Sequence, residues 1–312
     1  MSKPEWSVFT INTLQTFAYI SLNRNRKNIR LLIRKLSKLS TLLPSALECY
    51  KLNILIWPYT TFMCSLILGL TIMVIYLNYG MQKMNTIRTS DRIPEGLRKY
   101  FATMFYISLT MAIVILHGLC FAFAGYYHFV CNCMKLFFLE FISKTKDLIK
   151  LQDYQSALQI YQELTETMSF VNDFLAFPAF LNVLSIMFGL FIYSYVFVIF
   201  QKDDYLMYVF TLGGVTYYLM ALIPMIMSGA DCNWAASQAR DKTISLPGWF
   251  PQHYRMLKMF IRQKFKKKYA LTLWKIYVIR ESLLMSALGT LVTYGFLVGT
   301  MGIAQGLEAE NH

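Results

Sequence analysis

The sequence predicts an all-α protein, a polytopic membrane helix bundle with long cytosolic helix extensions, and three observations lead to this fold class. Apolar residues make up 56% of the chain and charged residues only 15%, well below the roughly 25% of a soluble domain. Apolar runs long enough to cross a bilayer as helices recur along the chain. Basic segments alternate with short loops between these runs, as expected for spans whose cytosolic connections are the long ones.

The first part of the chain, residues 1–52, combines a weak apolar run with a basic segment. The run from Val8 to Leu22 is short and interrupted by polar residues, so it predicts a weak first span. The segment from Arg24 to Lys38 has no acidic residue and carries leucines and isoleucines between its basic residues. Two interpretations fit this cytosolic segment: a basic amphipathic helix at the anionic inner leaflet, and a solvated basic loop.

Residues 53–127 predict two transmembrane helices and an outer loop. Ile54 to Tyr79 and Tyr100 to Tyr127 are the two apolar runs, and the second contains His117 near its middle. An ionisable residue at this depth is a candidate for function. Because no acidic partner lies in the same segment, we expect a neutral histidine that is hydrogen-bonded to a neighbouring helix.

Residues 128–176 predict a cytosolic helical hairpin, in which Phe129 to Ile149 extends the preceding span out of the membrane. Apolar residues then alternate in steps of three and four, which indicates one buried face of a long helix. These positions are Tyr154, Ala157, Tyr161, Leu164, Met168, Val171 and Leu175. The face fits two partners, another helix of the same chain or another subunit.

The remaining segments complete the predicted topology. Residues 177–228 form two transmembrane helices, and the linker 201–204 is so short that they must be antiparallel neighbours. The glycine pair at Gly213 and Gly214 permits close packing or a bend. The other segments are a basic cytosolic helical region at 229–281, a final pore-lining transmembrane helix at 282–303 and a short extracellular tail at 304–312.

The distribution of basic residues sets the orientation. Most lysines and arginines fall in the three long segments, which the positive-inside rule places in the cytosol, so the C-terminus lies outside. A G-protein-coupled receptor needs a cytosolic C-terminus, and this topology argues against that class. An oligomeric channel agrees better with long cytosolic helices and almost no extracellular mass.

Several other classes lack their sequence signals. Basic residues that flank apolar runs, without a groove-reading motif, argue against a nucleic-acid partner. Cys131, Cys133 and His128 are too few for a metal site, and we expect no cofactor. Paired intramembrane carboxylates, a histidine-rich box and a nucleophile motif are all missing from the sequence, so we expect no enzyme.

The end of the chain resembles a known family. Arg280 to Tyr294 is similar to the signature of the last span in insect gustatory receptors, and the region around Asn172, Asp173 and Pro178 resembles the approach to their fifth span. The resemblance covers about the last two-thirds of the chain. It implies a gustatory chemoreceptor, a ligand-gated non-selective cation channel that responds to small organic tastants. It also implies a homo- or hetero-tetramer with related receptor subunits, in the plasma membrane of sensory neurons.

Candidate site residues follow from the resemblance and from residue chemistry. The resemblance assigns the pore and signature motif to Thr293, Tyr294, Leu297, Thr300 and Met301. The ligand pocket is expected in the outer halves of the earlier spans, where rings with polar groups suit small organic ligands. The candidates are Tyr106, His117, Tyr193, Tyr195, Tyr208 and Phe210. Membrane aromatics also serve packing, which is the alternative for each of them.

Two departures from the family pattern affect these expectations. Thr300 and Met301 stand where the family usually has Gln and Phe beside the pore, so gating or selectivity is expected to differ. The sequence shows six apolar runs where the family has seven spans. If the basic segment at Arg24 matches the loop after the family's second span, the first span is absent. The chain is then a fragment, a shortened gene model or a degenerate receptor.

Two functional alternatives remain open. An odorant receptor of the same superfamily shares most of these features, although Thr293 and Tyr294 favour the gustatory branch. A secondary transporter would require internal repeats and charged groups at mid-membrane depth, and the sequence shows no convincing repeat.

Overall fold

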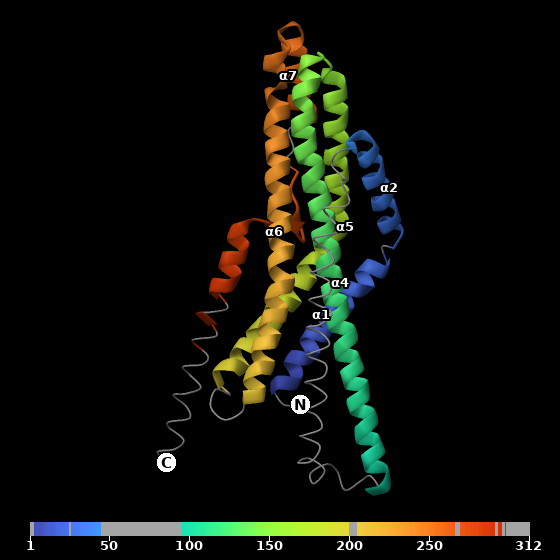
Figure 1. The fold of residues 1–312 in the computed structure, drawn as a ribbon, viewed down its shortest axis with the longest axis vertical. Helices are drawn as coiled ribbons and strands as arrows, with labels where there is room; N and C mark the ends of the chain where they lie inside the picture. The colour runs from blue at the N-terminus through green and yellow to red at the C-terminus, as the bar shows by residue number, and fades with distance from the viewer. Residues whose placement is uncertain are drawn as a thin grey trace.

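The described part of the protein is a bundle of long helices (Figure 1). The computed structural model describes residues 3–24, 26–44, 95–199, 205–265 and 269–290, with residues 293, 294 and 297. Its elements are α1 (Lys3–Arg24), α2 (Arg26–Leu42), α4 (Glu95–Lys150), α5 (Tyr154–Ile199), α6 (Tyr205–Trp249), η2 (Pro251–His253), α7 (Tyr254–Lys264), β1 (Thr272–Leu273) and β2 (Tyr277–Val278). Residues 281–290 form a further helical stretch. The all-α prediction is confirmed.

Three helices, α4, α5 and α6, are much longer than a bilayer is thick. At 1.5 Å per residue, the 56 residues of α4 extend about 84 Å, against about 30 Å of membrane hydrocarbon. As predicted, Phe129 to Ile149 continues the preceding apolar run as one helix. Two stretches of the described helices are long and apolar enough to cross a membrane, Tyr154–Tyr195 and Thr211–Trp249. The predicted span from Ile54 to Tyr79 lies outside the described residues.

A tight turn reverses the chain between α4 and α5. Asp153 N donates to Leu148 O (3.0 Å) and Gln152 N to Ile149 O (3.1 Å), the paired bonds of a Schellman motif. Gln152 takes the left-handed conformation that this motif requires, with φ 56°. Asp153 then caps α5, because its Oδ1 accepts from Ser156 N at 3.0 Å. Hydrogen bonds from the side chain and the backbone of Ser156 lower the pKa of the Asp153 carboxyl.

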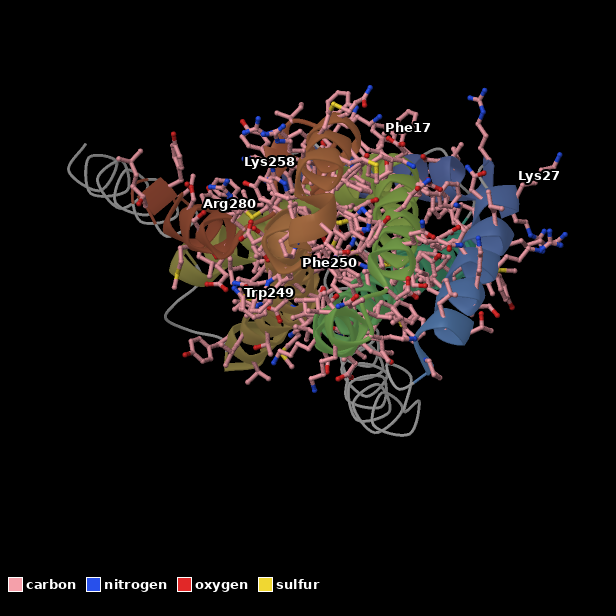
Figure 2. The ribbon with its side chains drawn as sticks, turned by 90° about the horizontal axis from the view of Figure 1, so that it is seen from above. Phe17, Lys27, Trp249, Phe250, Lys258 and Arg280 are labelled. Atoms are coloured by element: carbon pink, nitrogen blue, oxygen red, sulfur yellow. The ribbon has the colours of Figure 1, made fainter. Side chains whose placement is uncertain are left out.

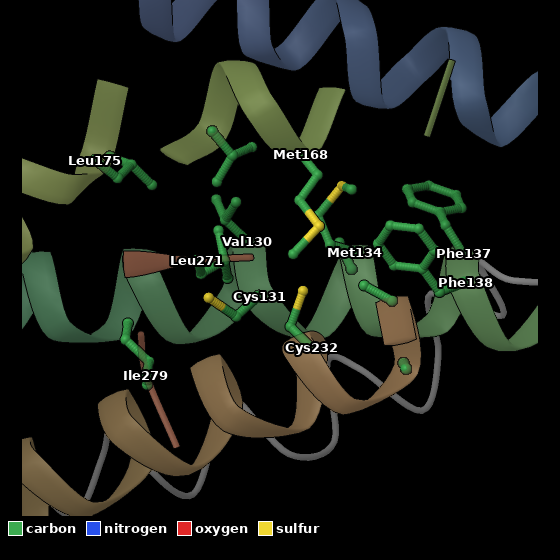
Figure 3. Close-up of a cluster of buried hydrophobic side chains, with 14 of the residues drawn as sticks. Val130, Cys131, Met134, Phe137, Phe138, Met168, Leu175, Cys232, Leu271 and Ile279 are labelled. Atoms are coloured by element: carbon green, nitrogen blue, oxygen red, sulfur yellow. The ribbon is translucent and has the colours of Figure 1, made fainter. Parts of the chain in front are cut away.

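The core is concentrated where α4, α5 and α6 run together below α7. Met134, Phe137 and Phe138 of α4 are fully buried there, and Met168 of α5 and Cys232 of α6 point toward them (Figure 3). We call this part of the bundle the closed half; it comprises residues 120–150, 154–187 and 218–265. The heptad positions of α5 from Ala157 to Leu175 are buried here by the same chain, so the face found in the sequence packs within the chain.

The other end of the bundle is open. The N-terminal part of α4 diverges from α5 and α6 (Figure 1). Large apolar side chains are exposed there, among them Met104, Met111 and Leu212. We call this part, residues 95–119, 188–199 and 205–217, the splayed half.

The basic segment forms α2, which lies along the closed half (Figure 1). Leu32 and Leu39 are buried against the bundle, and Lys38 Nζ pairs with Glu163 of α5 at 2.5 Å. Lys27 projects away from the bundle (Figure 2). Of the two interpretations, the amphipathic helix is confirmed and the solvated loop is wrong. Part of the apolar face of the helix is covered by the bundle.

The region 229–281 departs from the predicted helical form. It is helical as far as α7, but β1 and β2 then form an antiparallel hairpin in which Thr272 pairs with Val278. Trp274 and Lys275 turn the hairpin with positive φ angles of 48° and 59°. The alternation of β-branched and aromatic residues from Thr272 to Val278 is the local signal that a helical interpretation overlooks.

Candidate functional site

A histidine and three tyrosines meet where the splayed half joins the closed half. The hydroxyl of Tyr218 lies 3.2 Å from Nε2 of His117, and the hydroxyl of Tyr217 donates to the His117 carbonyl at 2.7 Å. Tyr193 of α5 completes the group, with its ring centroid 5.8 Å from that of Tyr218. The prediction that His117 bonds to a neighbouring helix is confirmed. We call these four residues the aromatic cluster.

Two glycines allow the aromatic cluster to close. A Cβ at Gly189 would overlap the ring of Tyr218, and a Cβ at Gly214 would overlap the ring of Tyr193. Gly214 therefore serves close packing, as predicted for the glycine pair. The cluster is a packed junction between α4, α5 and α6.

The predicted ligand-pocket residues are only partly brought together. His117 and Tyr193 share the aromatic cluster, whereas Tyr195 and Tyr208 have exposed side chains. Tyr106 and Phe210 lie in α4 and α6, and their side chains are outside the described residues. Tyr217 and Tyr218 were missed as candidates, because their sequence setting does not distinguish them from the other membrane aromatics.

The hairpin is fastened to two helices by two asparagines. Asn233 of α6 donates to Leu271 O (3.1 Å) and Ile279 O (2.8 Å), and its Oδ1 accepts from Leu271 N (2.6 Å). On the α5 side, Oδ1 of Asn172 accepts from the backbone N (2.7 Å) and the hydroxyl (2.9 Å) of Thr272. We call Asn172 and Asn233 the hairpin clamp.

Ion pairing and backbone bonding reinforce the α5 side of the hairpin. Lys275 Nζ lies 2.7 Å from Asp173 Oδ1, and Trp274 N donates to Ala176 O at 3.0 Å. Asn172 and Asp173 belong to the stretch that carried the resemblance before the fifth span. The structure therefore gives these two residues a physical role, holding the segment that leads into the last helix.

The last helix begins directly after the hairpin. Residues 281–290 are helical and leave the bundle beside α6 (Figure 1). Thr293 donates its hydroxyl to Gly289 O at 2.8 Å, while Tyr294 and Leu297 are 57% and 53% exposed. Thr300 and Met301 lie outside the described residues.

A cavity of about 580 Å³, with both polar and apolar lining residues, lies at the start of the last helix. Arg240 and Asp241 of α6 line one wall, and Arg280 and Glu281 line another. The start of the last helix is therefore not packed against α6 on this side. Among the described residues, no three potential metal ligands gather at one point.

The fold has known counterparts. Two solved structures of the insect olfactory receptor OR5 from Machilis hrabei superpose on this chain. One matches with a TM-score of 0.72 and 11% identity, over 94% of this chain and 79% of the receptor. The second, a complex with eugenol, matches with a TM-score of 0.70 and 12% identity, over 95% of this chain and 80% of the receptor. No protein-family model and no curated protein sequence matches the chain.

These likenesses show that the chain has the insect olfactory receptor fold. The matched length includes the long α4, α5 and α6, so the likeness covers the bundle and not one helix pair. At this level of identity the likeness concerns the fold alone.

Proposed function

We propose that the protein is a gustatory chemoreceptor, a subunit of a ligand-gated non-selective cation channel that responds to small organic tastants. The observation that carries this proposal is the olfactory receptor fold over 94% of the chain. The signature-like stretch from Arg280 to Tyr294 includes the described helical residues 281–290, which supports the proposal.

Ligand binding is assigned to the region of the aromatic cluster and the outer span halves beside it. Candidate contacts are Tyr106, His117, Tyr193, Tyr195, Tyr208 and Phe210. A ligand that packs against His117 or Tyr193 would compete with the contacts that join α4 and α5 to α6. Such a ligand opens the channel only if it binds the open arrangement more tightly than the closed one.

Transmission to the gate is assigned to the hairpin clamp. Because Asn172 and Asn233 fasten the hairpin to α5 and α6, a relative shift of these helices moves the segment from which the last helix starts. The cavity beside Arg280 and Glu281 leaves space for the first residues of the last helix to move. Leu222, Met225 and Cys232 of α6 lie between Tyr218 and Asn233 in the sequence and belong to one buried core cluster, which supports coupling between the aromatic cluster and the clamp.

The pore is assigned to the last helix of each subunit in a tetramer. Tyr294 and Leu297 are exposed in the single chain, and a central pore or a neighbouring subunit would cover them. Apolar side chains are also exposed on α6, α7 and the hairpin, including Trp249, Met259 and Ile276. Exposed apolar groups in this number favour contact with further subunits, of the same or a related kind.

The proposed location is the plasma membrane of sensory neurons, with the end of the closed half that carries α7 in the cytosol. α2 and α7 carry basic side chains on the closed half, and the positive-inside rule places such residues on the cytosolic side of the membrane. The C-terminus then lies outside.

Whole-cell recording tests the proposal. Cells that express this chain alone, or with a related receptor subunit, are exposed to a panel of sugars, alkaloids and phenols, including eugenol. We expect an inward cation current with at least one of these ligand classes. Saturating, stoichiometric uptake of a ligand without channel openings would instead establish the transporter.

Substitution of the proposed pore residues tests the gate. We expect the double variant Thr300→Gln/Met301→Phe, which restores the family pattern, to change conductance or gating. Unchanged conductance and gating would remove these two positions from the pore. The exposed Gln238→Met on α6 is the control, because it lies outside the last helix.

An odorant receptor of the same superfamily is the second candidate, and the likeness to the two solved structures suits either branch. Both matched structures are of an olfactory receptor, and one of them contains eugenol. Responses to volatile phenols without responses to sugars or alkaloids would select this alternative. Either outcome leaves the channel mechanism in place.

A further inference from the structure

A second cavity lies on the opposite flank of the bundle, between α1, α4 and α5. Its volume is about 580 Å³, and most of its wall is apolar, with Leu119 and Phe123 of α4 and Leu22 of α1 among the lining residues. Arg26 also lines the cavity, at the start of α2. α1 crosses the bundle on this flank (Figure 1).

A buried amide stands in the wall of this cavity. Gln15 of α1 is 4% exposed, yet neither its Oε1 nor its Nε2 makes a hydrogen bond to a described residue. The side chain of Gln15 interacts with the thiol of Cys120, but sulfur is a weak hydrogen-bond partner and leaves the amide largely unsatisfied. A buried amide with both polar atoms unpaired is costly, so such a group is expected to meet a partner beyond the described residues.

Polar groups from two further helices line the same cavity. The hydroxyl of Tyr126 in α4 is buried and has no hydrogen-bond partner among the described residues. Asn182 of α5 is 2% exposed, and its Nδ2 makes only long contacts, 3.4 Å to Cys120 O and 3.8 Å to Met225 Sδ. Three helices therefore each contribute a buried polar side chain to one apolar cavity.

We propose that this cavity binds an apolar molecule that carries a hydroxyl group. A hydroxyl both donates and accepts, so it can satisfy Oε1 and Nε2 of Gln15 together. The walls near Leu119 and Phe123 suit the apolar body. None of the lining residues is acidic, and Gln15 carries no charge to pair with an ion.

Water alone does not explain the arrangement. One water molecule fills about 30 Å³ of liquid volume and would satisfy Gln15, but most of the cavity would remain apolar and unfilled. A larger occupant satisfies the amide and fills the apolar space at once.

The site is separate from the proposed ligand pocket. The described residues that line it include none of the six candidate pocket residues, so failure of this site would leave the channel proposal intact. Two sources supply the required chemistry, a membrane alcohol such as a sterol and a free phenol or alcohol.

Photolabelling of the full chain tests the site. The protein is reconstituted in phosphatidylcholine vesicles that contain a photoreactive cholesterol analogue, and labelled peptides are identified by mass spectrometry. In parallel, 4-propylphenol is titrated against the purified protein, and both its competition with the label and its effect on thermal unfolding are measured. Saturable labelling within residues 15–26 or 119–126 indicates that the site binds a sterol. Stabilisation against thermal unfolding by the phenol, without saturable labelling by the sterol, indicates a free small molecule. Either result supports the proposal.

Matched variants separate ligand binding from folding. We expect Gln15→Met, which keeps the shape and removes the amide, to weaken labelling or protection about tenfold or more, because both hydrogen bonds between the amide and the ligand hydroxyl are lost. Tyr126→Phe should weaken it less, and the exposed Gln238→Met should leave it unchanged. Without ligand, Gln15→Met should be at least as stable as the wild type, because an unpaired buried amide has been removed.

Three outcomes would overturn the proposal. One is equal labelling or protection of the wild type and Gln15→Met. Another is that neither probe labels or protects the wild type. The third is a ligand-free Gln15→Met that is less stable than the wild type, which would show that the amide already has a partner.

Discussion

The two halves of the bundle are built for different surroundings. In the closed half, aromatic and sulfur-containing side chains such as Phe138 and Met168 are fully buried, and ion pairs such as Lys135 to Asp231 (2.6 Å) cross between helices. In the splayed half, Met104 and Met111 of α4 are 70% and 59% exposed. The closed half thus completes its core within one chain, whereas the splayed half needs lipid or further subunits to cover its apolar surface.

Truncation of core residues should separate the halves most strongly. We expect Phe138→Ala to lower the free energy of unfolding by about 3–5 kcal/mol, because it leaves a cavity among fully buried side chains. Met104→Ala should change it by less than about 0.5 kcal/mol, as for other exposed sites. Thermal unfolding of both variants in the same micelles measures the difference. Similar losses for the two variants would contradict the distinction between the halves.

Removal of the clamp should have the next largest effect. Asn233→Leu leaves the backbone groups of Leu271 and Ile279 without their partner, so we expect a loss of about 2–3 kcal/mol and faster hydrogen exchange across residues 271–279. Asn132→Leu is the matched control, since Asn132 bonds His128 of its own helix at 2.9 Å. It should leave exchange in the hairpin unchanged. Equal protection of the hairpin in both variants would show that Asn233 does not hold it.

The ring of Tyr218 packs against Gly189 in space that a side chain at this position would occupy. We expect Gly189→Ala to destabilise the protein by about 1–3 kcal/mol, because the new methyl group displaces the buried ring of Tyr218. Gly118→Ala, one residue from His117, meets no atom within 4 Å and should be neutral or slightly stabilising. Thermal unfolding compares the two. A neutral Gly189→Ala would mean that the junction between the halves is loosely packed.

The smallest effect should be a gain in stability at the turn of the closed half. Gln152 holds a positive φ that glycine adopts without strain, so we expect Gln152→Gly to stabilise the protein by up to about 1 kcal/mol. The exposed Gln159→Gly within α5 should destabilise it by a similar amount, because glycine is unfavourable inside a helix. Denaturant unfolding distinguishes these signs, and a loss of stability in Gln152→Gly would rule out strain at this residue.

Local patterns account for the parts of the fold that the sequence predicted. The spacing from Ala157 to Leu175 repeats with the period of a helix, so its buried face follows from neighbouring residues alone. The hydrogen bond of His117 to another helix was predicted from the lack of an acidic partner nearby. Its actual partner, Tyr218, lies 101 residues away and depends on how the helices pack.

Long-range contacts account for the parts that were missed. Asn172 bonds the hairpin 100 residues further along the chain, and no local pattern marks that pairing. The cavity beside Gln15 forms only when α1, α4 and α5 pack together. In the sequence alone, Gln15 is only a polar interruption of the weak first run. Sequence periodicity thus predicts which face is buried, whereas packing decides which residues meet.

Single-channel recording of the purified chain in planar bilayers tests the central claim most directly. We predict stepwise unitary currents carried by both sodium and potassium, with an open probability that rises with the concentration of the activating ligand. Saturable uptake of that ligand by the same preparation, without unitary steps, would contradict the account.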